Sequence, residues 1–293
     1  MQEIFEFRID SDFFHLLPKP NNGKANGIVY IVTMTRNDPN FQEIEKLKRF
    51  VKEKYDKSFV FGWQIKRKYS MKELDTASIL HLNIKALFEP TGEECGTLFD
   101  EMAACEICGA TRKQVSPLIL KKGTIPNKDI SKTIGGEVVV SGKFVNAINQ
   151  RNLKGLLLTP VNFEKGVSDY YQLTAITELG LSHRTVVGID PFNFSESSEA
   201  IEFTVPGGGH IKFEKEIYKC PKGDSIGLNI LSECYVLNSQ SIGEYDFFAS
   251  KQKIGIKRGL LRPEPVYFCS QAFKRMIEEE KLTGFEFEVA HIE

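Results

Sequence analysis

Three cysteines with spacing suited to metal ligation lie close together in this sequence of 293 residues. Cys105 and Cys108 are separated by two residues and followed by Gly109, and Cys95 precedes the pair. A turn of this kind directs two thiolates toward one point about 2.3 Å from a zinc ion, and the glycine lets the backbone curl around the sulfurs. We therefore predict one structural zinc site that includes all three cysteines.

A closed structural zinc site needs a fourth ligand. Our first choice is Cys220, because a weak internal repeat places its segment in the corresponding part of the other half of the chain. The alternatives are Asp224, His81 and His210. A redox pair is another interpretation of Cys105 and Cys108, but such a pair usually opens a helix directly after a strand, and no strand pattern precedes Cys105.

Two further cysteines, Cys234 and Cys269, lie in apolar segments and are predicted to be core residues. The composition, with 41% hydrophobic and 26% charged residues, is that of a soluble globular protein with one large core or two smaller ones. A net charge of −1 provides no overall field to attract nucleic acid or a membrane surface.

We expect a cytoplasmic location without a membrane span. The chain starts without an export signal, and no segment approaches eighteen uninterrupted apolar residues. Reducing conditions in the cytoplasm keep thiols free, which favours metal ligation over disulfides.

Residues 1–90 are predicted to form an N-terminal α/β unit. Residues 27–34 are a β-branched apolar run, as expected of a strand buried on both faces. Residues 41–55 carry apolar side chains at steps of three and four and therefore predict an amphipathic helix. Further expected elements are a strand over 58–65, a short helix over 71–80 and an extended segment over 79–88. The sequence Pro90-Thr91-Gly92 then ends the unit.

The internal repeat organises residues 91–293. Segment 139–160 aligns with segment 268–289, and in both an apolar strand leads to a serine at a helix N-cap, a short helix, a glycine at its C-terminus and a second strand. We therefore predict a mixed α/β fold, in which a zinc-stapled, duplicated strand-helix-strand domain over 91–293 follows the N-terminal unit.

This order of motifs resembles the double-CXXCG immunity proteins of polymorphic bacterial toxin systems. The Cys105–Gly109 turn, the first repeat copy, a second cysteine segment at Cys220 and the second copy carry the resemblance, which covers residues 90–293. It implies a cytoplasmic, non-catalytic protein that binds and blocks a cognate toxin domain. The second segment departs from the family pattern, since Lys222 stands where a second cysteine is expected.

An enzyme, zinc-dependent or hydrolytic, is the alternative from a different class. Residues 223–227 fit the Gly-x-Ser-x-Gly nucleophile pattern around Ser225, and Asp246 and His291 follow in the order of a hydrolase triad. However, Pro221 interrupts the strand that should lead into such a serine. A turn explains the segment equally well, and we assign no catalytic residue.

Basic residues mark two further candidate surfaces. Lys257, Arg258 and Arg262 form a compact basic loop, a candidate contact for an acidic protein partner. Segment 46–69 mixes basic and aromatic residues as a nucleic-acid face does, but the polar face of the predicted helix already requires these charges. A nucleic-acid-binding accessory factor is therefore the third hypothesis, behind protein binding.

Overall fold

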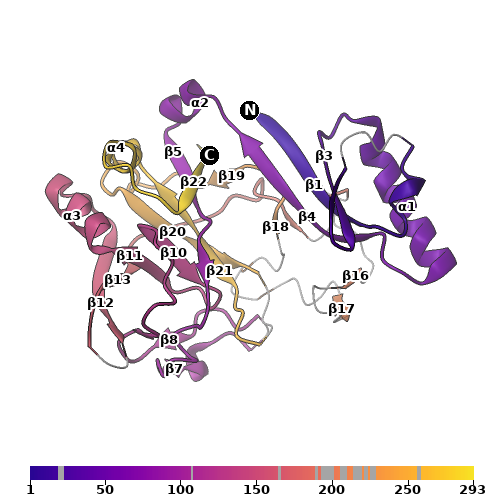
Figure 1. Cartoon of the computed structure of the whole chain (residues 1–293). Coiled ribbons are helices and arrows are strands. Elements are labelled where there is room, and N and C mark those ends of the chain that lie inside the picture. The colour runs from indigo at the N-terminus through magenta and orange to yellow at the C-terminus, as the bar shows by residue number, and fades with distance from the viewer. Residues whose placement is uncertain are drawn as a thin grey trace. The chain divides into compact units, whose positions relative to one another are not determined.

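The computed structural model describes residues 1–18, 23–106, 108–163, 166–188, 191–192, 201–204, 210–213, 220, 224, 229–255 and 259–293 (Figure 1). The chain divides into two compact units. The first unit comprises Met1–Ser70 and the returning segment Asp190–Glu216, and the second comprises Met71–Ile189 and Ile217–Glu293. None of the helices described is both long enough and apolar enough to cross a membrane.

The first unit is an antiparallel sheet with a helix packed on it. Its strand order is β2-β3-β1-β4, with β1 at Gln2–Asp10, β2 at Lys24–Asn26, β3 at Val29–Met34 and β4 at Val60–Lys68. Helix α1 (Pro39–Tyr55) begins after Asp38, whose Oδ1 accepts a hydrogen bond from the backbone N of Asn40 at 2.8 Å. The apolar face of α1 packs on the sheet through Phe41, Ile44 and Val51.

Smaller elements complete this unit. The 3₁₀-helix η1 (Phe14–Leu16) follows β1, and the returning segment forms a hairpin of β16 (Ile201–Thr204) and β17 (His210–Phe213).

Strand β3 differs from its prediction. It pairs antiparallel with β1 and β2, and only Val32 and Met34 of its residues are buried, so the expectation of a strand buried on both faces is wrong. An antiparallel sheet buries one face only, so an apolar run longer than the strand leaves residues such as Ile28 in solvent, where 75% of it is exposed.

The second unit contains two six-stranded sheets. The first has the order β6-β10-β11-β13-β12-β9, with strands at Leu87–Phe88, Ile130–Thr133, Val138–Ser141, Val167–Ala175, Leu156–Phe163 and Ile119–Leu120. The second has the order β14-β20-β21-β5-β22-β19, with strands at Glu178–Leu179, Phe247–Ile254, Glu264–Cys269, Ile79–Ile84, Phe285–Ile292 and Cys234–Val236. With the helices, these sheets confirm the mixed α/β class.

The two predicted repeat copies occupy equivalent places in these sheets. Helix α3 (Gly142–Arg151) joins β11 to β12, and helix α4 (Gln271–Glu279) joins β21 to β22. The hydroxyl of Ser141 accepts a hydrogen bond from the backbone N of Phe144 at 3.2 Å, and Ser270 does the same for Phe273 at 3.2 Å. A common origin of the two copies stays a prediction.

One strand of the second sheet comes from far earlier in the sequence. Strand β13 lies between β11 and β12, and β5 fills the same place between β21 and β22. Because β5 belongs to this sheet, the first unit ends at Ser70 and not at the boundary expected at residue 90. The helix expected at 71–80 is α2 (Met71–Thr76), which immediately precedes β5.

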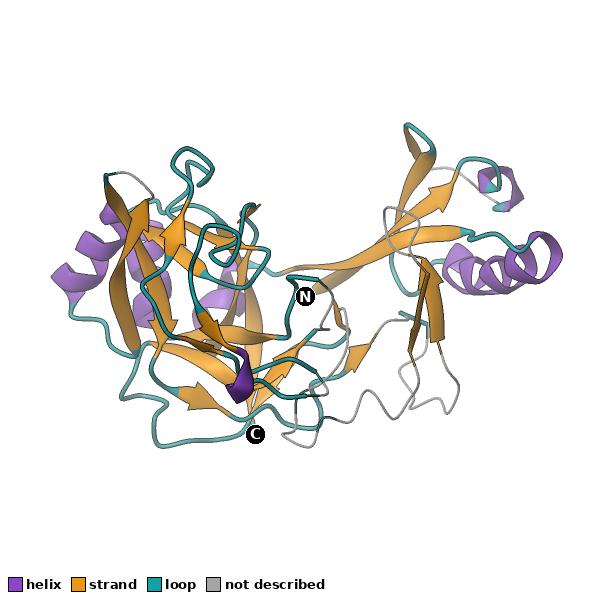
Figure 2. Ribbon diagram, turned by 90° about the horizontal axis from the view of Figure 1, so that it is seen from below, coloured by secondary structure: helices purple, strands orange, loops and turns teal. Residues whose placement is uncertain are grey.

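Reciprocal contacts join the two sheets. The carboxylate of Asp129, just before β10, accepts a hydrogen bond from the backbone N of Thr283 at 2.9 Å, and that of Asp246, just before β20, accepts one from Lys154 N at 2.9 Å. Helices α3 and α4 lie together at one end of the unit (Figure 2) and share a core in which the Phe144 and Phe273 rings are 5.9 Å apart.

Two short ladders complete the second unit. Strands β15 (Val187–Gly188) and β18 (Asn229–Ile230) pair antiparallel, and so do β7 (Phe99–Asp100) and β8 (Lys113–Gln114). The β7–β8 hairpin carries Cys105 and Cys108 in its connecting loop.

Candidate metal centre

The β7–β8 loop folds into a tight turn around its two cysteines. A 3₁₀-helix, η2 (Glu101–Ala103), starts where Asp100 Oδ1 accepts a hydrogen bond from Met102 N at 3.0 Å. Cys105 N then donates to Ala110 O at 2.8 Å, and Gly109 N donates to Cys105 O at 2.8 Å. Gly109 has a φ of 69°, which is why a glycine suits this position.

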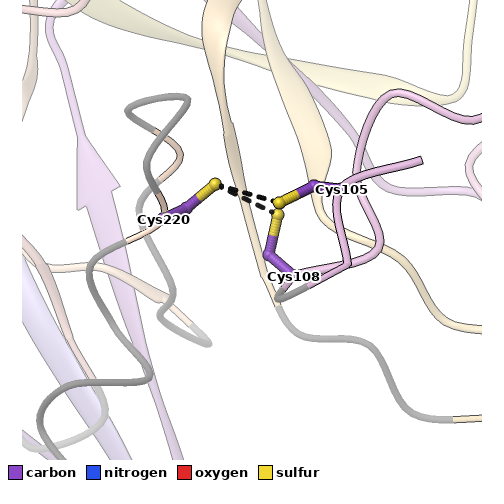
Figure 3. Close-up of side chains that lie close together, drawn as sticks. All are labelled: Cys105, Cys108 and Cys220. Carbon is purple, nitrogen blue, oxygen red and sulfur yellow. Dashed lines mark hydrogen bonds between the residues drawn. The ribbon is translucent and has the colours of Figure 1, made fainter. Parts of the chain in front are cut away.

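Cys220 lies against the same turn, as Figure 3 shows. Its Sγ is 3.4 Å from Cys105 Sγ and 3.5 Å from Cys108 Sγ, and the three sulfurs all lie within 4.8 Å of one another. All three cysteines are buried, and none of them forms a disulfide. A disulfide needs about 2.05 Å between sulfurs, whereas two sulfurs bound tetrahedrally to one zinc are about 3.8 Å apart. Three buried cysteines so arranged can hold a metal ion.

A carboxylate completes one side of this group. Asp224 Oδ2 lies 3.3 Å from Cys108 Sγ and 3.3 Å from Cys220 Sγ. The other oxygen, Oδ1, accepts a hydrogen bond from the backbone N of Lys253 in β20 at 2.8 Å. Asp224 is 4% exposed, so its carboxylate is almost entirely withdrawn from solvent.

The environment of the thiols raises the pKa of Cys108. Burial is the main cause, and the neighbouring Cys220, Asp224 and Cys105 side chains raise it further, against a backbone hydrogen bond from Ala110 that lowers it. A bound cation reverses this effect, because metal coordination deprotonates a thiol outright. A metal that binds here therefore displaces the thiol protons that this environment retains.

Cys95 is not part of the group that the structure brings together. It is half-buried in a separate turn, where its backbone N donates to Thr91 O at 3.2 Å and to Gly92 O at 3.1 Å. Of the alternative ligands, Asp224 lies at the cluster and His81 lies elsewhere, beside Glu288. The His210 side chain is outside the described part of the chain.

Arg112 anchors the hairpin that carries the cysteines. Its guanidinium lies 3.8 Å from the centre of the Phe99 ring and forms ion pairs with Glu93 and Glu101. Burial lowers the pKa of this arginine, but the two carboxylates more than offset that effect and raise it. Arg112 therefore stays charged and connects the segment before β7 to the residues after the turn.

The predicted basic partner loop is only partly described. Lys257 and Arg258 lie outside the described residues. The guanidinium of Arg262 turns inward, where it donates hydrogen bonds to the backbone oxygens of Gly259 and Leu261 and lies 3.8 Å from Glu101. These contacts within the chain hold its charge in place.

The residues of the alternative hydrolase triad have other partners. Asp246 accepts hydrogen bonds from Ser270 Oγ and Lys154 N, and His291 Nε2 lies 2.9 Å from Glu233 Oε2. Ser225 lies outside the described residues, as do the glycines of the 206–210 loop. Three of the basic residues of α1 pair with nearby acids, as Lys46–Glu43, Arg49–Glu45 and Lys52–Asp56.

A cavity of about 340 Å³ adjoins the cysteine turn. Gly109 and Thr111 of the loop line it, together with Phe99 and Gln114 of the hairpin and Lys253 of β20. The described cysteines are not among its lining residues. The cavity therefore lies beside the cysteine turn and is not lined by the described cysteines.

The sequence has no significant match among known protein families or among curated proteins.

Sequence reasoning missed the exposed apolar residues of this hairpin. Leu98 is 62% exposed, Met102 95% and Val115 55%. Nothing in the local sequence separates such residues from core residues, because exposure depends on which face of the hairpin the rest of the chain covers.

Proposed function

We propose that this chain is a non-catalytic, cytoplasmic protein-binding protein whose cysteine cluster holds one structural zinc. The observation that carries the proposal is that the cysteine-bearing hairpin exposes three large apolar side chains to solvent, those of Leu98, Met102 and Val115. Exposed apolar side chains on one surface element are characteristic of contact sites for other proteins.

The pairing of the hairpin strands determines which way the side chains of Leu98 and Val115 point. Val115 N donates a hydrogen bond to Leu98 O at 2.9 Å, so the two residues lie opposite each other in the ladder. Side chains alternate along a strand, and Phe99 and Gln114, the next residues inward, line the cavity on the other face. Leu98 and Val115 therefore point outward together.

Acidic residues are frequent in the first half of the hairpin. Segment 93–106 contains no lysine or arginine, and its acidic residues are Glu93, Glu94, Asp100, Glu101 and Glu106. Arg112, after the turn, pairs with Glu93 and Glu101, so the remaining negative charge comes from the other three. Potentials at protein interfaces are complementary, so the surface suits a protein partner with a basic face. The same charge opposes nucleic acid, which disfavours the accessory-factor hypothesis.

The resemblance to immunity proteins suggests the identity of the partner. Under this hypothesis it is a toxin domain with a basic cleft, which the acidic hairpin covers. The donor set also supports zinc, because three thiolates favour zinc over the hard cations magnesium and calcium. The zinc-enzyme alternative gains no support, since a catalytic zinc keeps an open position toward a pocket and these sulfurs do not line the adjacent cavity.

Co-expression with the neighbouring genes of its chromosome, followed by purification at moderate salt, tests this proposal. We expect the wild type to retain a basic protein, and Leu98→Lys combined with Val115→Lys to weaken its binding at least about 100-fold. The matched control is Leu157→Lys with Ile176→Lys, since these residues are also exposed but belong to β12 and to the residue after β13, and not to the hairpin.

Each outcome bears on the proposal. Binding that survives in the control, fails in the hairpin variant and weakens as salt rises supports it. No bound protein, or equal retention by both variants, contradicts it. Equal zinc content in both variants shows that the hairpin has kept its fold.

A further inference from the structure

The three cysteines leave a zinc ion one ligand short of a closed site. Structural zinc sites are four-coordinate and tetrahedral. Among the described residues, the donor atoms that all lie within 4.8 Å of one another are the sulfurs of Cys105, Cys108 and Cys220, and neither Cys95 nor Asp224 meets that limit against all three. The carboxylate of Asp224 nevertheless lies against two of these sulfurs, those of Cys108 and Cys220.

The distances suit a shared metal. Asp224 Oδ2 is 3.3 Å from two of the sulfurs, and a sulfur and an oxygen bound tetrahedrally to one zinc are about 3.6 Å apart. The contacts of Cys220 and Asp224 with their neighbours, from 3.3 to 3.5 Å, are slightly tighter than in a filled tetrahedron. Asp224 and Cys105 lie farther apart, since the two are not in one mutually close group, so binding of one ion by all four groups requires them to approach each other.

The second oxygen of Asp224, Oδ1, accepts a backbone hydrogen bond, as the carboxylates of metal sites commonly do. Its hydrogen bond from Lys253 N, at 2.8 Å, fixes the plane of the carboxylate and directs Oδ2 toward the sulfurs. Such outer hydrogen bonds orient the groups that bind the metal and are part of most metal sites. The bond also connects the site to strand β20 of the second sheet.

Burial supplies an independent reason for a cation here. Asp224 is 4% exposed, and in the part of the chain that the structure describes no lysine, arginine or histidine forms an ion pair with it. Withdrawing a carboxylate from water without a counter-charge is costly. A divalent cation among these donors would supply the missing counter-charge.

We propose that Asp224 is the fourth ligand of a Cys3Asp zinc site, through Oδ2. The proposal rests on the zinc site proposed above and identifies its composition. One ion then joins the hairpin turn at 105–108 to the segment at 220–224 and, through Lys253, to β20.

Cobalt substitution tests this ligand set, because Co²⁺ occupies such sites and its thiolate charge-transfer absorption grows with each cobalt–sulfur bond. We expect Asp224→Ala to lower cobalt and zinc affinity at least about 100-fold. Asp224→Cys is expected to restore tight binding and to increase the charge-transfer absorption by about one third, from three sulfurs to four. The matched control is Cys95→Ser, which should leave the spectrum and affinity unchanged.

The outcomes separate this proposal from the one on which it rests. If the wild type binds no cobalt, the zinc site itself fails and so does its ligand set. If the wild type binds one equivalent but both Asp224 variants keep its spectrum and affinity, only the assignment of Asp224 is overturned. Loss of the spectrum in Cys95→Ser would overturn it in favour of Cys95.

Discussion

His81 is a buried histidine in the second sheet, outside the cysteine cluster. It lies opposite Glu288 in the β5–β22 ladder, with its Nδ1 3.8 Å from Glu288 Oε2, too far for a hydrogen bond but close enough for attraction. Its ring centre is 6.1 Å from that of Phe268 on β21. Burial lowers the pKa of His81, but Cys234 and Glu288 outweigh burial and raise it to about 10.

This pKa predicts a pH dependence of stability. A folded-state pKa above the unfolded value means that charged His81 stabilises the fold fully below the unfolded pKa of about 6.5, and that this contribution is lost as pH rises toward about 10. We expect the stability difference between wild type and His81→Gln to shrink over this range, by up to about 1.4 kcal/mol per pH unit. Urea unfolding of both proteins at several pH values measures it, and a difference that grows with pH would refute the assignment.

Residue spacing predicted part of the candidate site. Two residues between cysteines and a following glycine indicate a turn that converges two thiols, and Cys105 and Cys108 do converge. The interval from Cys95 to Cys105 says nothing about whether the connecting loop returns, and the turn at 91–96 gives Cys95 hydrogen bonds of its own. Asp224 was one of several possible donors, because spacing alone does not rank oxygen ligands.

Two glycines decide how closely the sheets of the second unit approach each other. Gly155 and Gly284 each follow a helix and precede a strand, with φ values of 100° and 113°. A Cβ on Gly155 would lie 2.3 Å from Phe247 O, and one on Gly284 would lie 2.0 Å from Ile130 O. Both obstacles are main-chain oxygens at the starts of β20 and β10, so neither can move aside without disturbing a sheet.

We expect Gly284→Ala to lower the free energy of unfolding by roughly 3 kcal/mol or more, because the alanine adds backbone strain at a positive φ to a clash with the main chain. Gly243→Ala is the matched control, because Gly243 has a similar φ of 102° but nothing within 4 Å of the position that the alanine methyl group would take. It should lose only the strain, about 1 kcal/mol. Equal losses in denaturant unfolding would show that the close approach does not matter.

Local sequence signals located elements better than they located the neighbours of those elements. The serine caps indicated where α3 and α4 begin, because capping is a property of a few adjacent residues. The glycines expected at the C-caps are not there, since α3 is capped by Asn152 and α4 by Glu280, before Gly155 and Gly284. The place of β5 was not predictable in this way. Its partners β21 and β22 lie near the other end of the chain. Hydrophobic periodicity indicates which face of a strand is buried, but it does not indicate which strands pair with it.

At the scale of the whole molecule, several contacts join segments that are far apart in the sequence. The first unit includes residues 190–216 from the middle of the sequence. In the second unit, Lys154 after α3 and Thr283 after α4 each donate a hydrogen bond to an aspartate that precedes a strand of the other sheet. The cysteine cluster works in the same way, because it joins Cys105 and Cys108 to a segment more than a hundred residues later. A metal bound by these cysteines would therefore cross-link two segments of the second unit that are far apart in the sequence.

Zinc content per chain is the most direct test of this metal centre. Elemental analysis of protein purified without chelators should give about one equivalent for the wild type and for Cys95→Ser, and a loss of most of it for Cys105→Ser and for Cys220→Ser. Because metal binding in such a site contributes folding energy, the two depleted variants should also unfold at lower denaturant concentration. A wild type without zinc, or undiminished zinc in Cys220→Ser, would contradict a metal centre that joins these distant segments.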